Sequence, residues 1–138
     1  MNLKVITPEK VFFDGPINEV IVPTPNGEIA ILPGHVNLLT QVSDGEVIIK
    51  SSSKDQYLAV TNGFLQIQKD EVSLISDFAI RSDEIDAKKA QDAQKQAQER
   101  MQNTKDSTEQ DMALAQAEMR RAILQLNVLN RRRGSRQV

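Results

Sequence analysis

The chain has 138 residues, 39% of them apolar, and its 17 basic and 19 acidic side chains leave a formal net charge of −2. This balance is typical of one or two small folded domains rather than a disordered tail. The absence of cysteine excludes disulfide frameworks, thiol catalysis and cysteine-ligated metals, and no apolar run approaches the roughly 20 residues that cross a bilayer. The first residues lack the basic and apolar segments of an export signal, so a cytoplasmic protein is expected.

Residues 1–80 are expected to form short strands, because they hold all the aromatic residues, all the prolines and five of the six glycines. Turn residues such as Asp14-Gly15-Pro16, Pro33-Gly34 and Lys69-Asp70-Glu71 separate the apolar segments. Short strands with no room for crossover helices favour an antiparallel β-sandwich or flattened barrel. The predicted strands are 3–6, 10–13, 19–22, 28–32, 38–42, 46–50, 56–60, 64–68 and 72–76.

Residues 81–138 contain no proline or aromatic residue, and their helix-forming composition predicts an antiparallel two-helix hairpin. Ser82 or Asp83 is expected to cap the first helix, and Ser107 with Gln110 fits a capping box for the second. The apolar stripes predicted to face each other are Ala87, Ala90, Ala93, Ala97 and Met101 on the first helix, and Met112, Ala115, Met119, Ala122, Leu126 and Leu129 on the second. The chain is therefore predicted to be a mixed two-domain protein, with a β-sandwich at 1–82 and a helical hairpin at 83–138. Because an alanine face buries little apolar surface, the hairpin is expected to be weakly held and open to displacement by a partner.

The sequence predicts neither a catalytic residue nor a metal site. His35 is the only histidine, which excludes paired-histidine metal sites and most nucleophile–base arrangements. Because it follows Pro33-Gly34, we interpret it as a turn residue. The acidic residues 83, 84 and 86 are interpreted as charges at the positive end of a helix dipole.

The densest charge in the chain is Arg131-Arg132-Arg133. It is either a solvated helix end or a surface that docks to an acidic partner. Nucleic acid is disfavoured as that partner, because the chain is acidic overall and no aromatic residue lies near the cluster.

Several segments together resemble one known family. Residues 27–35 read G-E-I-A-I-L-P-G-H, with V-I-T-P at 5–8, N-G-F at 62–64, I-D at 85–86 and R-R-A at 120–122. This set, spread over nearly the whole chain, resembles the epsilon subunit of the F-type ATP synthase, called delta in mitochondria. Asn62 and Asn37 stand where the family usually has glycine and proline.

The resemblance implies a non-catalytic central-stalk subunit of a proton-translocating ATP synthase. Such a subunit couples gamma to the c-ring and inhibits ATP hydrolysis through its carboxyl-terminal helices. It would lie at the cytoplasmic face of a bacterial plasma membrane, as a peripheral protein that meets the membrane only through the complex. The implied c-ring and gamma contacts are Ile31, Leu32, Pro33, Gly34 and His35. The implied contacts to acidic segments of the alpha and beta catalytic subunits are Arg120, Arg121, Arg131, Arg132 and Arg133.

Some members of this family bind ATP through an Ile/Leu-Asp-x-x-Arg-Ala motif and arginines of the second helix. The matching residues here are Asp86, Lys89, Ala90 and Arg121, with Gln125 in place of another arginine. Lys89 keeps the positive charge of the usual arginine but lacks the planar fork that grips phosphate. We therefore expect weak or absent ATP binding and no other cofactor.

Two alternative functions remain open from the residues alone. The first is a free-standing adaptor whose helical hairpin binds a partner helix. The second is a small β-sandwich enzyme, which is disfavoured because the chain offers one histidine, no cysteine and no convincing nucleophile–base pair.

Overall fold

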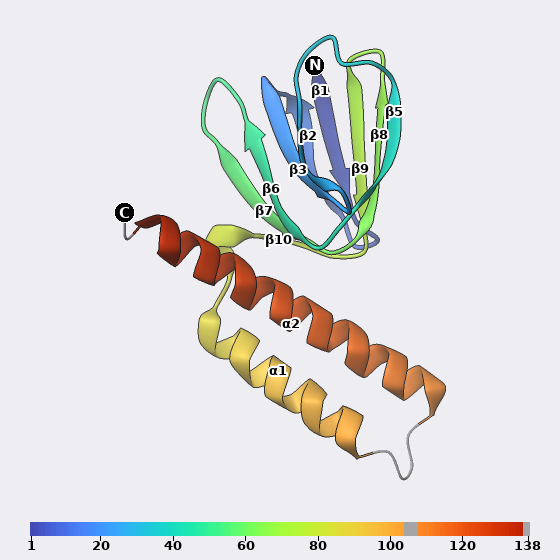
Figure 1. Cartoon of the computed structure of the whole chain (residues 1–138), viewed down its shortest axis with the longest axis vertical. Coiled ribbons are helices and arrows are strands. Elements are labelled where there is room, and N and C mark those ends of the chain that lie inside the picture. Colours follow the sequence, from blue (N-terminus) through green and yellow to red (C-terminus); the bar gives the residue numbers. More distant parts are fainter. Residues whose placement is uncertain (104–107, 137–138) are drawn as a thin grey trace. The chain divides into compact units, whose positions relative to one another are not determined.

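The computed structural model describes residues 1–103 and 108–136, with side chains up to Arg131, and divides into two compact units, Met1–Asp83 and Glu84–Val138 (Figure 1). The first unit is a β-sandwich and the second is a pair of helices, which confirms the predicted fold class. None of the described helices is long and apolar enough to cross a membrane.

The sandwich consists of two five-stranded sheets. One sheet has the order β2-β1-β9-β8-β5 and the other has the order β10-β7-β6-β3-β4. The strands are β1 (Asn2–Ile6), β2 (Val11–Pro16), β3 (Glu19–Thr24), β4 (Gly27–Ile31), β5 (Leu38–Val42), β6 (Gly45–Lys50), β7 (Gln56–Val60), β8 (Gly63–Gln68), β9 (Glu71–Ser76) and β10 (Ala79–Arg81).

Three features of the sheets differ from the sequence prediction. Asp14-Gly15-Pro16, expected to be a turn, forms the end of β2, where proline is tolerated because β2 is an edge strand. Strand β10 was not predicted, since three residues are too few to show an alternating pattern. The pairing of β1 with β9 is parallel, whereas all pairs were expected to be antiparallel.

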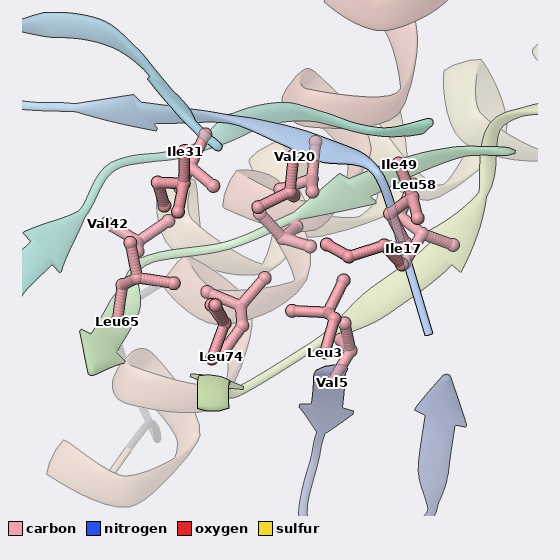
Figure 2. Close-up of a cluster of buried hydrophobic side chains, with 14 of the residues drawn as sticks. Leu3, Val5, Ile17, Val20, Ile31, Val42, Ile49, Leu58, Leu65 and Leu74 are labelled. Atoms are coloured by element: carbon pink, nitrogen blue, oxygen red, sulfur yellow. The ribbon is translucent and has the colours of Figure 1, made fainter. Parts of the chain in front are cut away.

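The core lies between the two sheets and is made of large aliphatic side chains. Alternation along the strands places Leu3 and Val5 of β1, and Leu65 and Ile67 of β8, on the inner face. Figure 2 shows side chains from both sheets pointing toward one another. The labelled members are Leu3, Val5, Ile17, Val20, Ile31, Val42, Ile49, Leu58, Leu65 and Leu74, and all are buried.

The first helix of the second unit begins later than predicted. A short 3₁₀ helix, η1 (Ser82–Glu84), precedes α1 (Ala87–Gln102). The cap of α1 is Asp86, whose Oδ1 accepts a hydrogen bond from the Lys89 N–H at 3.1 Å. The prediction of Ser82 or Asp83 as the cap was wrong. Ser82 is buried, and its hydroxyl donates to Oε2 of Glu46 at 2.8 Å within the first unit.

Helix α2 (Glu109–Arg136) begins with a reciprocal capping box. The Asp111 N–H donates to Oγ1 of Thr108 at 3.1 Å, and the Thr108 N–H donates to Oδ2 of Asp111 at 3.2 Å. The box is thus one residue later than the predicted pair of Ser107 and Gln110. Ser107 itself lies outside the described residues.

The two helices lie side by side and antiparallel (Figure 1). Ala90 and Ala97 of α1 are buried, as are Ala115 and Ala122 of α2. Ala93 is exposed, so its place in the predicted stripe was wrong. The partly buried members of the predicted α2 stripe are Met112, Met119, Leu126 and Leu129.

Leu124 and Val128 of α2 are buried although they are absent from the predicted stripe. At 100° per residue they lie on the side of the helix opposite Ala122 and Leu126. Their spacing of four residues was the signal for this second apolar face.

Candidate functional site

The loop between β4 and β5 contains a type II turn. The His35 N–H donates to the Leu32 carbonyl oxygen at 3.2 Å, which closes a four-residue turn. Proline at the second position presets its φ, and Gly34 at the third has a φ of +83°, a conformation that residues with a Cβ rarely adopt. The Pro-Gly pair therefore fixes the shape of the loop tip.

Two further hydrogen bonds attach this loop to the turn between β8 and β9. The Gly34 N–H donates to Oδ1 of Asp70 at 2.9 Å. The Lys69 N–H donates to Oδ1 of Asn37 at 3.2 Å. The loop is thus held at two points by residues more than 30 positions away in the chain.

The loop exposes two apolar side chains, but Ile31, which was expected to make a surface contact, is not one of them. Leu32 is 53% exposed and Val36 is 75% exposed. Ile31 is fully buried in the sandwich core, so a surface contact through its side chain is excluded. Pro33 and Gly34 are exposed and His35 is half-buried. Nδ1 of His35 lies 2.7 Å from the Val36 carbonyl oxygen, which accepts only, so this contact requires the proton on Nδ1.

A second exposed apolar surface crosses the outer face of the β2-β1-β9-β8-β5 sheet. Strand register aligns Val11 with Ile6, Ile6 with Ile75, and Ile75 with Phe64. Val11, Ile75 and Phe64 are 50%, 53% and 55% exposed, and Ile6 is half-buried. We call these four side chains the outer apolar row. Its neighbouring exposed apolar side chains make this row a candidate binding surface.

The sequence analysis missed this row, although alternation contained the signal. Leu65 and Ile67 of β8 point inward, which leaves Phe64 on the outer face. In β9, Val72 and Leu74 point inward and leave Ile75 outside. An apolar residue at an outward position of two adjacent strands is the pattern that identifies the row.

Gly63 explains the N-G-F motif in structural terms. A Cβ at Gly63 would lie 1.8 Å from the backbone oxygen of Ile75, a distance that no side chain tolerates. The glycine therefore allows β8 to approach β9 closely next to Phe64. The preceding residue, Asn62, is held by its N–H, which donates to Oδ1 of Asp44 at 2.8 Å.

The predicted arginine surface follows helix α2. Arg120 and Arg131 are exposed and Arg121 is half-buried; the side chains of Arg132 and Arg133 lie outside the described part of the structure. Eleven residues are close to three helical turns, so Arg120 and Arg131 share one side of α2. Arg120 and Arg131 thus lie on one side of α2 about three turns apart, and Arg121 lies about 100° around the helix from Arg120.

The residues expected around ATP lie at separate levels of the hairpin. Asp86 caps α1 through its carboxylate, and Ala90 is buried. An ion pair at 2.8 Å places Glu118 opposite Arg100. Because the helices are antiparallel, Arg121 on α2 is then level with residue 97 on α1. Residue 97 is eight residues after Lys89, so Arg121 lies about 12 Å farther along the helix axis than Lys89. Among the described residues, no group of three or more histidine or acidic side chains could hold a metal ion.

Comparisons with known families match both units. The family described as ATP synthase, Delta/Epsilon chain, beta-sandwich domain matches residues 1–82. The family described as ATP synthase, Delta/Epsilon chain, long alpha-helix domain matches residues 83–130. Together the two family models cover most of the chain.

Individual relatives give the same result. The chain is 39% identical over 137 residues to the ATP synthase epsilon chain 2 of Ralstonia nicotianae, covering 99% of this chain and 97% of the relative. Its fold is similar to a chain of the Euglena gracilis mitochondrial ATP synthase OSCP/F1/c-ring structure, with a TM-score of 0.64, 19% identity and coverage of 86% and 74%. It is also similar to a chain of the Tetrahymena thermophila mitochondrial ATP synthase central stalk/c-ring structure, with a TM-score of 0.60, 17% identity and coverage of 92% and 94%.

Proposed function

Because this chain belongs to the delta/epsilon chain family of ATP synthase, we propose that it works as a non-catalytic subunit of the central stalk that couples gamma to the c-ring. In this function it performs no chemistry, and ATP is made or hydrolysed on the alpha and beta subunits. The observation that carries the proposal is the pair of apolar surfaces on the sandwich, since a coupling subunit needs two separate contacts on one rigid body.

We assign the outer apolar row to gamma. Phe64 and Ile75 are about half exposed on the middle strands of a paired sheet, so they offer a preformed surface with little entropy left to lose on binding. Aromatic and large aliphatic side chains at the centre of a contact commonly supply most of its binding energy. A protein partner with an apolar face of its own fits this row.

We assign the loop of residues 32–37 to the c-ring. Leu32 and Val36 are exposed on either side of a turn whose backbone is already fixed. Pro33, Gly34 and His35 add a small, mildly polar surface between them. A loop of this kind docks without first having to be ordered.

We assign the helical hairpin to inhibition of ATP hydrolysis. Its helices are joined through alanine side chains, which bury little surface and leave the pair open to rearrangement. Arg120 and Arg131 share one side of α2 and would meet acidic segments of a catalytic subunit. In this proposal, Arg121, Arg132 and Arg133 add positive charge to the same helix.

This assignment places the protein at the membrane only through its complex. The 39% identity to a bacterial epsilon chain supports the cytoplasmic face of a bacterial plasma membrane as the site of that complex.

The gamma contact can be tested with Phe64→Ser. Removing the ring, the largest side chain of the outer apolar row, should weaken binding of the full chain to purified gamma at least tenfold, measured by calorimetry. Leu114→Ser is the matched control, because Leu114 is 57% exposed on α2, outside the row. Equal binding by both variants and by the unaltered chain would remove the row from the gamma contact.

The inhibitory role can be tested by deleting residues 107–138. The complex is reassembled with the shortened chain, and ATP hydrolysis is measured without a proton gradient. A faster rate is expected; an unchanged rate would contradict inhibition while leaving coupling intact. Recovery of the full chain without any rotary-complex subunit would instead favour the adaptor function.

ATP binding by the hairpin is proposed to be weak or absent. Asp86 uses its carboxylate as a helix cap, and Arg121 lies about 12 Å along the axis from the level of Lys89. Calorimetry of the full chain with MgATP should give no measurable heat at micromolar concentrations. Micromolar affinity would contradict this.

A further inference from the structure

The turn between β8 and β9 has a left-handed backbone conformation that lysine does not favour. Lys69 and Asp70 have φ values of +50° and +62°, and Gln68 pairs with Glu71 across them. These features define a two-residue turn of type I′, in which Asn-Gly is the preferred sequence. Aspartate tolerates this conformation, but lysine accepts it only at some cost, so local turn preference does not explain Lys69.

Contacts to distant segments explain the two residues better. Oδ1 of Asp70 accepts a hydrogen bond from the Gly34 N–H at 2.9 Å, and the carbonyl oxygen of Asp70 accepts one from the Asn2 N–H at 2.9 Å. Lys69 offers its N–H to Oδ1 of Asn37 at 3.2 Å. The turn therefore joins the start of β1 to the tip and to one end of the 32–37 loop.

We propose that Asp70 and Asn37 are positioning residues that hold the 32–37 loop in its docking conformation. The inference rests on the proposed c-ring contact and identifies what shapes it. Asp70 acts on the loop tip through Gly34, and Asn37 acts at the loop's end. Neither residue needs to touch the partner for this role.

The physical basis is the cost of ordering a loop. Fixing the backbone of one residue costs about 1–2 kcal/mol, and a flexible loop meets that cost when it binds. Hydrogen bonds to an ionised carboxylate are stronger than those between neutral groups. With Gly34 and Asn37 held, Leu32 and Val36 remain exposed in fixed positions and are ready to make contact.

The test compares Asp70→Gly with Asp70→Asn in the full chain. Glycine removes the carboxylate and adopts a positive φ without strain. Any effect of Asp70→Gly on the loop therefore cannot come from strain in the turn. Asparagine keeps an oxygen that accepts from Gly34 and also tolerates this φ. At the other contact, Asn37→Ala removes the acceptor and Asn37→Asp keeps it.

Two measurements are made on each variant. The first is hydrogen exchange of the Gly34 and Lys69 amides in the free chain. The second is affinity for membranes that carry the rotor ring and have been stripped of this subunit, with Leu32→Asp as the reference for a damaged contact. We expect Asp70→Gly to speed Gly34 exchange roughly tenfold and to weaken docking severalfold. Asn37→Ala should do the same at Lys69, and the asparagine and aspartate variants should retain both properties.

The outcomes separate this inference from the proposed function. Unchanged Gly34 exchange in Asp70→Gly would overturn the inference whatever happens to docking. Faster exchange with normal docking, while Leu32→Asp docks poorly, would overturn the positioning role and leave the c-ring contact standing. Normal docking by Leu32→Asp would overturn the c-ring contact itself, and the inference with it.

Discussion

The interiors of the sandwich and of the hairpin contain side chains of different size. The sandwich buries Leu3, Ile31 and Leu74 completely, whereas the buried residues of α1 are Ala90 and Ala97. A fully buried leucine or isoleucine contributes about 1.5–3 kcal/mol, and each buried methyl-sized group only about 0.8 kcal/mol. A single chain thus combines a unit whose core is filled by large aliphatic side chains with one in which four of the buried side chains are alanines.

The largest expected effect distinguishes two neighbouring residues of the sandwich. Ile31→Asp places an unpaired carboxylate in the core and should cost more than about 3 kcal/mol of unfolding free energy. Leu32→Asp, at an exposed position, should stay within about 0.5 kcal/mol of the unaltered chain. Urea unfolding followed by the emission of Tyr57, the only tyrosine, measures both. Similar stabilities would mean that Ile31 is not a core residue.

The alanine contact of the hairpin should be the next most sensitive position. Ala97→Leu overfills the space between α1 and α2 and should destabilise the hairpin by about 1–3 kcal/mol, with the sandwich unchanged. Helix loss is followed by far-ultraviolet circular dichroism and sandwich unfolding by Tyr57 emission. Ala93→Leu is the control, because Ala93 is exposed on the same helix. If both variants lost helix equally, the two helices would not be in close contact at residue 97.

The start of α1 gives a smaller effect and tests which residue is the cap. Asp86→Ala removes the acceptor for the Lys89 N–H and should cost about 1 kcal/mol of helix stability. Asp83→Ala should be within about 0.5 kcal/mol of neutral, since its carboxylate is exposed before the helix. Thermal melting followed by circular dichroism compares them. A larger loss at residue 83 would restore the earlier assignment of the cap.

The smallest effect is expected at the ion pair between the helices. Arg100 and Glu118 are joined at 2.8 Å, but their side chains are 56% and 36% exposed. Exposed pairs contribute about 0–1 kcal/mol and weaken as salt is added. A double-mutant cycle with Arg100→Gln and Glu118→Gln should give a coupling energy in that range that falls with ionic strength. A coupling energy that did not change with ionic strength would contradict the solvent exposure of this ion pair.

Local sequence signals predicted the elements better than their connections. Alternation located the segments around Leu65 and Leu74, because inward and outward side chains repeat every second residue in any strand. It failed at Asp14-Gly15-Pro16, where turn residues lie in an edge strand whose free side needs no hydrogen bonds. The parallel pairing of β1 with β9 also went unpredicted, because register between distant strands leaves no mark on either one.

The candidate site shows the same limit. Pro33-Gly34 identified the loop tip from its turn chemistry alone. The burial of Ile31 depends on how the two sheets pack, and the contact of Asp70 with Gly34 joins residues 36 positions apart. Neither follows from the residues next to it in the chain.

The position of β1 between β2 and β9 has a consequence for how this protein is made. As the chain is synthesised, its first two strands can pair with each other, but the inner edge of β1 waits until residues 71–76 have emerged. Contacts over such sequence separations form slowly, because the chain loses the entropy of closing a long loop before these contacts stabilise it. The newborn chain therefore carries an unpaired strand edge while residues 7–70 are made, and in this period chaperones or the growing chain's own charges must keep it from aggregating.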